Sequence, residues 1–168
     1  MQEKVFQLLV DNTSGVLSRI SGLFSRRGYN IESITAGVTA DPKYTRITSV
    51  TSGDDEILDQ IEKQVEKLED VRVIKVLEPD SSVYRELVLI KIRVDAENRQ
   101  AVINDANVFR AKIVDVVSDS LIVELTGDKK KIDAFMKLIV DDGYEILELA
   151  KTGITGLSRG IDNVTFLD

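Results

Sequence analysis

The sequence predicts an α+β protein made of two βαββαβ units. Three observations support this fold class. A strand–helix–strand–strand–helix–strand pattern of apolar residues occupies 5–77, and the same order recurs in 84–150. Between them lies the polar segment 78–82, which carries one of the chain's two prolines. Because about 80 residues can bury one modest core, we predict domains at 1–79 and 80–168 of the 168-residue chain.

The first predicted unit opens with an apolar strand and continues with a helix whose apolar residues begin at Val16. Gly28 is the expected end of that helix, and Asp41-Pro42-Lys43 is a predicted turn between two strands. The predicted elements of this unit, in order, are a strand at 5–10, a helix at 16–24, strands at 31–40 and 44–51, a helix at 57–68 and a strand at 71–77.

The second predicted unit repeats the order with different residues. Its predicted elements are a strand at 84–94, a helix at 95–107, strands at 109–117 and 121–126, a helix at 129–140 and a strand at 144–150. The remaining segment, 151–168, is rich in Gly and Thr and fits neither unit. Repetition of the whole order predicts two domains of one kind.

A βαββαβ unit of this kind is a ferredoxin-like fold, in which both helices cover one face of an antiparallel sheet. Several residues predicted for the other face are apolar, so we expect that face to pack on a partner or on the other domain. The edge strands also favour pairing across a dimer axis.

Composition excludes several classes of function. The chain has 22 basic and 29 acidic residues, a net charge of −7, and neither Cys nor His. Thiolate or imidazole catalysis, disulfides and zinc sites built on Cys or His are therefore excluded, and a nucleic-acid partner is disfavoured. Acidic pairs at 54–55 and 141–142 are interpreted as turns, so no catalytic residues, metal or cofactor are expected. With no apolar span and no signal peptide, we expect a cytoplasmic protein that does not bind membranes.

One segment, Asp11 to Val16, is arranged like a binding loop between the first strand and the first helix. Its simplest interpretation is helix capping by Asn12, Thr13 or Ser14. The alternative uses the same free N–H groups and partial positive charge to bind a carboxylate, with Gly15 allowing close approach. Asp11 or Asn12 would then accept hydrogen bonds from an ammonium group. The residues alone leave both interpretations open.

A family resemblance adds to this interpretation. Asn12, Ser14-Gly15, 17–20 and the string 22–33, which contains Gly28-Tyr29-Asn30-Ile31, resemble the N-terminal ACT domain of the acetolactate synthase (acetohydroxyacid synthase) small subunit. Further matches to the family's C-terminal domain lie at 114–117, 131–135 and 153–160. The resemblance therefore covers the whole chain and implies an N-terminal ACT domain with an ACT-like domain after it.

The resemblance implies a non-catalytic regulatory subunit of branched-chain amino-acid biosynthesis. Such a subunit activates a separate thiamine-diphosphate-dependent large catalytic subunit and confers feedback inhibition by valine or another branched-chain amino acid. The family binds its effector between the ACT domains of a homodimer, which assigns effector-binding roles here to Asn12, Ser14, Gly15, Val16, Asn30 and Ile31. The alternative is a free-standing ACT-type amino-acid sensor that acts on a different enzyme.

Overall fold

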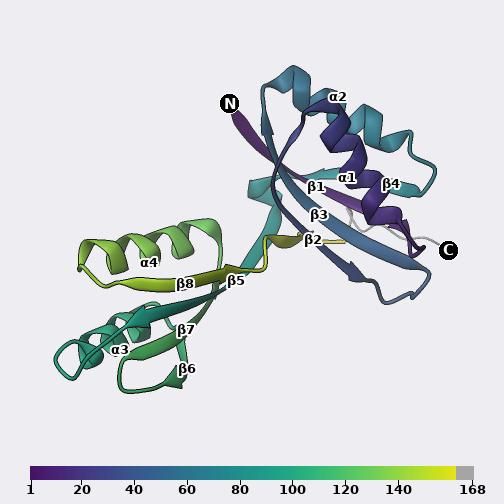
Figure 1. Ribbon diagram of the computed structural model, residues 1–168. Coiled ribbons are helices and arrows are strands. Elements are labelled where there is room, and N and C mark those ends of the chain that lie inside the picture. The colour runs from purple at the N-terminus through teal and green to yellow at the C-terminus, as the bar shows by residue number, and fades with distance from the viewer. Residues whose placement is uncertain (162–168) are drawn as a thin grey trace. The chain divides into compact units, whose positions relative to one another are not determined.

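The computed structural model describes residues 1–161 and divides the chain into two compact units. One unit contains Met1–Val83 together with the described residues from Ile154 onward, and the other is Tyr84–Gly153 (Figure 1). The second unit is thus inserted into the first, whereas the sequence assigned all of 80–168 to one domain. The part of the predicted tail at 162–168 lies outside the described residues.

The first unit has the predicted βαββαβ order. Its elements are β1 (Gln2–Asp11), α1 (Val16–Arg27), β2 (Asn30–Val38), β3 (Tyr44–Gly53), α2 (Asp55–Glu66) and β4 (Val71–Leu77). The four strands form an antiparallel sheet in the order β2-β3-β1-β4. Gly28 ends α1 in the left-handed conformation at φ 69°, and its amide donates to the carbonyls of Phe24 and Ser25, as the sequence predicts.

Strand periodicity puts the core of the first unit on one sheet face. Phe6, Leu8 and Val10 alternate along β1 and pack against the apolar faces of α1 and α2. Their β3 neighbour Ile47 and the α2 residue Leu58 are fully buried. Both helices therefore cover the same face of the sheet, which confirms the predicted ferredoxin-like arrangement.

The second unit repeats this arrangement after a short 3-10 turn, η1 (Pro79–Ser81). Its elements are β5 (Ser82–Arg93), which begins two residues before the unit boundary, α3 (Arg99–Val108), β6 (Lys112–Val116), β7 (Ser120–Gly127), α4 (Lys129–Asp141) and β8 (Ile146–Lys151). The strand order is β6-β7-β5-β8, and α3 and α4 pack on the core formed by β5 and β7.

Helix α3 begins later than the sequence predicts. The Asp95 carboxylate accepts from the amides of Glu97 and Asn98, and the Asn98 side chain accepts from the amide of Asp95. This side-chain turn competes with helix formation, so α3 begins at Arg99. Phe109, predicted to open the next strand, instead follows the helix and packs edge-to-face on Phe135.

The described part of the tail covers part of the open face of the first sheet. Thr35 on β2 donates to the carbonyl of Ile154 at 3.2 Å, and Gln7 on β1 donates to the carbonyl of Gly156 at 2.7 Å. Lys75 on β4 donates to the Ser158 hydroxyl at 3.1 Å. The tail forms strand β9 (Thr155–Ser158), which pairs with β5. The sequence predicts that this face packs on a partner or on the other domain; the residues that cover part of it fall in the predicted 80–168 domain but fold with the first unit.

Candidate functional site

The β1–α1 loop brings Asn12, Ser14 and Gly15 to the N-terminus of α1. Gly15 is the N-cap residue, in the left-handed conformation at φ 82° and ψ 1°, and no side chain caps the helix. The interpretation that Asn12, Thr13 or Ser14 caps the helix is therefore wrong. The N–H groups of the first helical turn and the positive end of the helix dipole are left without a side-chain acceptor, which suits an anionic group.

The Asn12 side chain ties this loop to the β2–β3 turn. Its Nδ2 donates to the carbonyl of Pro42 at 2.9 Å, and its Oδ1 accepts from the Thr45 hydroxyl at 3.2 Å. The backbone amide of Asn12 also donates to the carbonyl of Lys43 at 2.8 Å. Asn12 thus fixes the position of the loop on the sheet, and both ends of its side-chain amide are already hydrogen-bonded.

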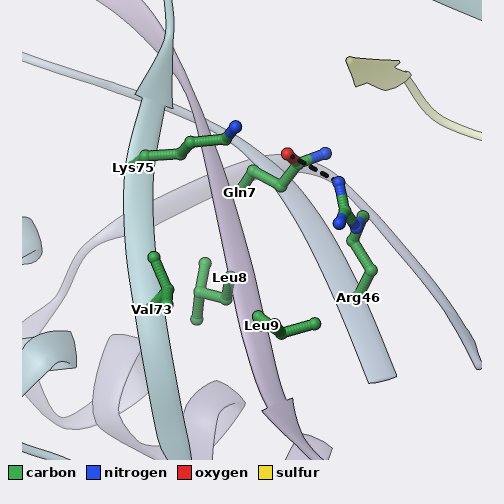
Figure 2. A pocket seen from close by; sticks show the side chains of 6 residues that line it. All are labelled: Gln7, Leu8, Leu9, Arg46, Val73 and Lys75. Atoms are coloured by element: carbon green, nitrogen blue, oxygen red, sulfur yellow. Dashed lines mark hydrogen bonds between the residues drawn. The ribbon is translucent and has the colours of Figure 1, made fainter. Parts of the chain in front are cut away.

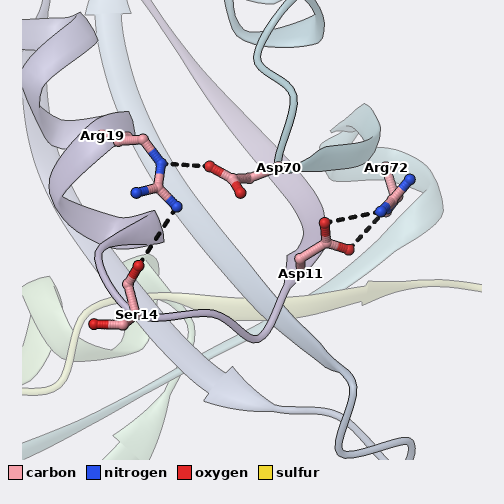
Figure 3. A network of polar contacts seen from close by, with 5 residues as sticks. All are labelled: Asp11, Ser14, Arg19, Asp70 and Arg72. Atoms are coloured by element: carbon pink, nitrogen blue, oxygen red, sulfur yellow. Dashed lines mark hydrogen bonds and ion pairs between the residues drawn. The ribbon is translucent and has the colours of Figure 1, made fainter.

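Two Arg–Asp ion pairs lie beside the loop (Figure 3). Asp11 accepts from Arg72 through both carboxylate oxygens, at 2.7 and 2.8 Å, so its charge is already balanced by a neighbouring cation. Arg19 on α1 pairs with Asp70 and also donates to the carbonyl of Ser14 at 3.5 Å. Asp11, expected along with Asn12 as a candidate ammonium acceptor, joins β1 to β4 through this ion pair.

The Arg19–Asp70 pair perturbs both groups. The hydrogen bond from Arg19 holds the pKa of the Asp70 carboxyl below its usual range, against the opposing effect of burial. The same bond raises the pKa of Arg19, so the guanidinium stays charged beside the N-terminus of α1. Sequence reasoning missed Asp70 and Arg72, because only the pairing of β1 with β4 brings these residues next to the loop.

Val16 and Ile31 have packing roles in the chain. The Val16 side chain is 7% exposed and belongs to the core of the first unit. Ile31 is partly buried and packs against the same core. The loop residues Asn12, Thr13, Ser14 and Gly15 are exposed, whereas Val16 after them is buried.

Asn30 lies at the opposite end of the sheet from Asn12. It opens β2 and pairs with Ser52 near the end of β3, while Asn12 contacts Thr45 near the start of β3. The seven residue-to-residue steps from Thr45 to Ser52 span about 24 Å at roughly 3.4 Å per step. The structure therefore brings Asn12, Ser14 and Gly15 together but places Asn30 and Ile31 in a second location.

Two hollows in the structure lie away from these residues. One, of about 10 Å³, lies on the open face of the first sheet (Figure 2) and is lined by Gln7, Leu8, Leu9, Arg46, Val73 and Lys75. Arg46 donates there to the side-chain amide oxygen of Gln7, Oε1, at 3.1 Å. Burial, followed by the nearby Arg46 charge, lowers the pKa of Lys75. This hollow has room for about one water molecule, not for an amino acid.

The second hollow, of about 190 Å³, lies on the open face of the sheet of the second unit. The Lys91–Glu148 ion pair, 3.0 Å long, borders it, and Leu89 and Leu149 contribute exposed apolar surface. None of the six predicted effector-binding residues lines either hollow.

The described residues 1–161 contain no group of three or more carboxylate ligands arranged to hold a metal ion. Within the same part of the chain, each helix is too short or too polar to cross a membrane.

Comparison with known families assigns both halves of the chain. Residues 6–73 match the family described as the AHAS small subunit-like ACT domain, and residues 85–160 match the family described as the small subunit of acetolactate synthase. The two matches follow one another with 11 residues between them, and together they span most of the chain.

Individual relatives agree with the family matches. The chain is 48% identical to a probable acetolactate synthase small subunit of Methanothermobacter thermautotrophicus over 93% of this chain and 92% of that protein. It is 44% identical to the acetolactate synthase isozyme 3 small subunit of Escherichia coli over 94% and 96%. The crystal structure of the Thermotoga maritima acetolactate synthase small subunit matches with a TM-score of 0.86 and 37% identity, over 96% of this chain and 99% of that one.

Proposed function

The chain belongs to the acetolactate synthase small-subunit family, and from this premise we propose that it is a non-catalytic regulatory subunit. It activates the thiamine-diphosphate-dependent catalytic subunit in the cytoplasm. It also mediates feedback inhibition by valine or another branched-chain amino acid bound between two ACT domains. In this proposal the first unit senses the effector and dimerises, while the second unit modulates the response.

One structural observation supports a binding site shared between two protomers. Gly15 lies in the loop that Asn12 ties to Thr45 at one end of β3, whereas Asn30 pairs with Ser52 near the other end, and these two β3 residues are about 24 Å apart at roughly 3.4 Å per strand residue. The carboxylate and ammonium groups of an α-amino acid share one carbon, so a single ligand cannot contact both residues of one chain. A second copy of the chain supplies the missing half, with Gly15 from one protomer and Asn30 from its partner. Each dimer of this kind has two equivalent sites.

The polar groups must provide most of the affinity. Burying a small branched side chain contributes about 1.5–3 kcal/mol. A sensor of micromolar to millimolar affinity needs about −8 to −4 kcal/mol in total. Charge-assisted hydrogen bonds at about 1.5–3 kcal/mol each supply the difference. We therefore assign the effector carboxylate to the N-terminus of α1 at Gly15, which no side chain caps.

Discrimination among branched-chain effectors depends on a smaller free-energy difference than binding itself. Valine and isoleucine differ by one methylene group, worth about 0.8 kcal/mol when it is buried. A ligand shared between protomers stabilises one arrangement of the dimer, and inhibition follows when the catalytic subunit binds a different arrangement better. A coupling energy of about 1–3 kcal/mol is the usual size of such an effect.

The test is calorimetric titration of the full chain with valine, with glycine and lysine as control ligands. We expect heat that saturates at no more than one valine per chain, and none in Gly15→Asp, which places a carboxylate where the effector carboxylate binds. Gln60→Glu adds the same charge on the exposed face of α2 and should bind valine normally. Normal binding by a folded Gly15→Asp protein would overturn the site.

The regulatory part of the proposal has its own measurement. Adding the chain to the purified acetolactate synthase catalytic subunit should raise its activity, and valine should lower that activity again. Gly15→Asp should retain activation and lose the response to valine. A chain that leaves the activity of the catalytic subunit unchanged would contradict the proposal.

A further inference from the structure

We propose that Glu32 is a positioning residue that fixes which atom of Asn30 faces the effector. This inference rests on the proposed function, because it concerns the Asn30 half of the shared site. Glu32 sits two residues after Asn30 on β2 and is exposed.

The geometry is a closed triangle of hydrogen bonds. Asn30 Nδ2 donates to Glu32 Oε1 at 2.5 Å and to Ser52 Oγ at 3.2 Å. Ser52 Oγ in turn donates to the same Glu32 oxygen at 2.7 Å. One carboxylate oxygen therefore accepts from both of its neighbours.

The chemistry of the carboxylate sets the orientation of the amide. An ionised carboxylate only accepts hydrogen bonds, so the nitrogen of Asn30, not its oxygen, must face Glu32. The Ser52 proton is committed to Glu32, which leaves a Ser52 lone pair to accept the second Nδ2 proton. Both protons of Asn30 are then used, and Oδ1 is the atom left to contact a ligand.

The backbone supports this role. The pairing register between β2 and β3 shifts between Ile31 and Ser33, so Glu32 is the extra residue of a β-bulge. Bulges redirect a side chain relative to a regular strand. Asn30 and Ser52 are direct register partners on the adjacent strands, so the three side chains meet at one end of the sheet.

The consequence is a site that selects for an ammonium group. A ligand atom that meets Asn30 Oδ1 must donate a hydrogen bond, which an α-ammonium group does and a keto oxygen does not. The effector then binds with its ammonium toward Asn30 of one protomer and its carboxylate toward Gly15 of the other. Without Glu32, the Asn30 amide is free to turn and present either atom.

The experiment compares valine with 3-methyl-2-oxobutanoate, the acid with the same carbon skeleton that carries a keto oxygen in place of the ammonium group. We expect the wild-type chain to bind valine and to bind the keto acid at least tenfold more weakly. Glu32→Ala should weaken valine binding on the order of tenfold and narrow the difference between the two ligands. Glu32→Gln keeps an acceptor oxygen for Asn30 and Ser52. It should therefore restore most of the valine affinity and most of the preference for valine over the keto acid. Glu66→Ala removes an exposed carboxylate of α2 and serves as the charge-matched control.

Three results would overturn either the role of Glu32 or the proposed function. Unchanged valine binding in Glu32→Ala would remove any role for Glu32. A Glu32→Gln protein as weak as Glu32→Ala would mean that the Glu32 charge acts on the ligand directly, which also overturns positioning. If the wild-type chain binds no branched-chain amino acid, alone or with the catalytic subunit, the proposed function itself fails.

Discussion

The side-chain amide of Gln7 donates a 2.7 Å hydrogen bond to the carbonyl of Gly156, which lies 149 residues further along the chain. Gln7 is on the central strand β1 and only 4% exposed, and Gly156 is buried above it. The Gln7 carbonyl oxygen accepts from Arg46 at 3.1 Å, so both ends of the amide are engaged. The tail is thus part of the fold of the first unit.

Gln7→Ala should destabilise the protein by about 1–3 kcal/mol. The substitution leaves the buried Gly156 carbonyl without its donor, and that desolvation penalty is not recovered from water. Urea unfolding of the full chain measures the change. Gln60→Ala, at an exposed position of α2, should change the free energy of unfolding by less than about 0.5 kcal/mol. Equal effects from the two variants would contradict the role of the tail.

Gly15→Ala and Gly28→Ala should each cost about 1 kcal/mol or more of stability, because both glycines have left-handed backbone angles, φ 82° and φ 69°. At Gly15 the added Cβ also comes within 3.1 Å of the Arg19 guanidinium, whereas at Gly28 no atom lies within 4 Å. Gly15→Ala should therefore be the more costly of the two. Gly37→Ala, where a Cβ meets open space, is the control. Thermal unfolding of the three variants measures these losses of stability. A Gly15→Ala protein that is no less stable than Gly28→Ala would contradict the expected order.

Asp70→Asn should flatten the acid limb of the stability curve. Arg19 holds the pKa of folded Asp70 below its unfolded value, so the unfolded chain takes up the proton first as the pH falls. The stabilisation is present above about pH 4, near the ordinary Asp pKa, and is lost as the pH drops through the lowered value. Denaturant unfolding between about pH 2 and 6 compares the wild type with Asp70→Asn. Asp133→Asn, at an exposed position of α4, is the control; identical slopes in the wild type and Asp70→Asn would refute the argument.

Asp105→Asn should stabilise the protein at neutral pH. Burial, aided by the neighbouring Asp142, raises the pKa of Asp105 on α3. The folded state therefore holds a proton that the unfolded chain has already released, and the free energy of unfolding falls as the pH rises from about 4 through the raised pKa. Burial raises the pKa of Tyr144, and the charges of Asp105 and Asp142 raise it further. Asp142→Asn should recover part of the same stability. A loss of stability at pH 7 in Asp105→Asn would contradict this argument, because it would show that the folded state compensates the Asp105 charge.

The sequence predicted helices and strands well wherever a single periodicity of apolar residues identifies the element. Alternation along β1 and 3.6-residue spacing in α1 are local signals, and both elements lie where expected. Observed element boundaries differ from the predicted ones where side chains bond to the backbone, as Asp95 and Asn98 do before the start of α3. The predicted effector residues came from a family resemblance, and the spacing of Asn12 and Asn30 along the chain gave no sign that they lie at opposite ends of one sheet.

By itself, the sequence determined the fold class, the two-unit repeat, the family and the absence of thiol or imidazole chemistry. The fold class, the repeat and the absent chemistry follow from local periodicity and composition, and the family follows from a resemblance in sequence motifs; none of these needs knowledge of distant contacts. Tertiary structure decided that the tail covers part of the first sheet, that Asp70 and Arg72 flank the loop, and that Glu32 and Ser52 meet at Asn30. Each of these depends on strand register or on contacts between segments distant in the chain. A shift of one residue in register turns every side chain of a strand to the opposite face.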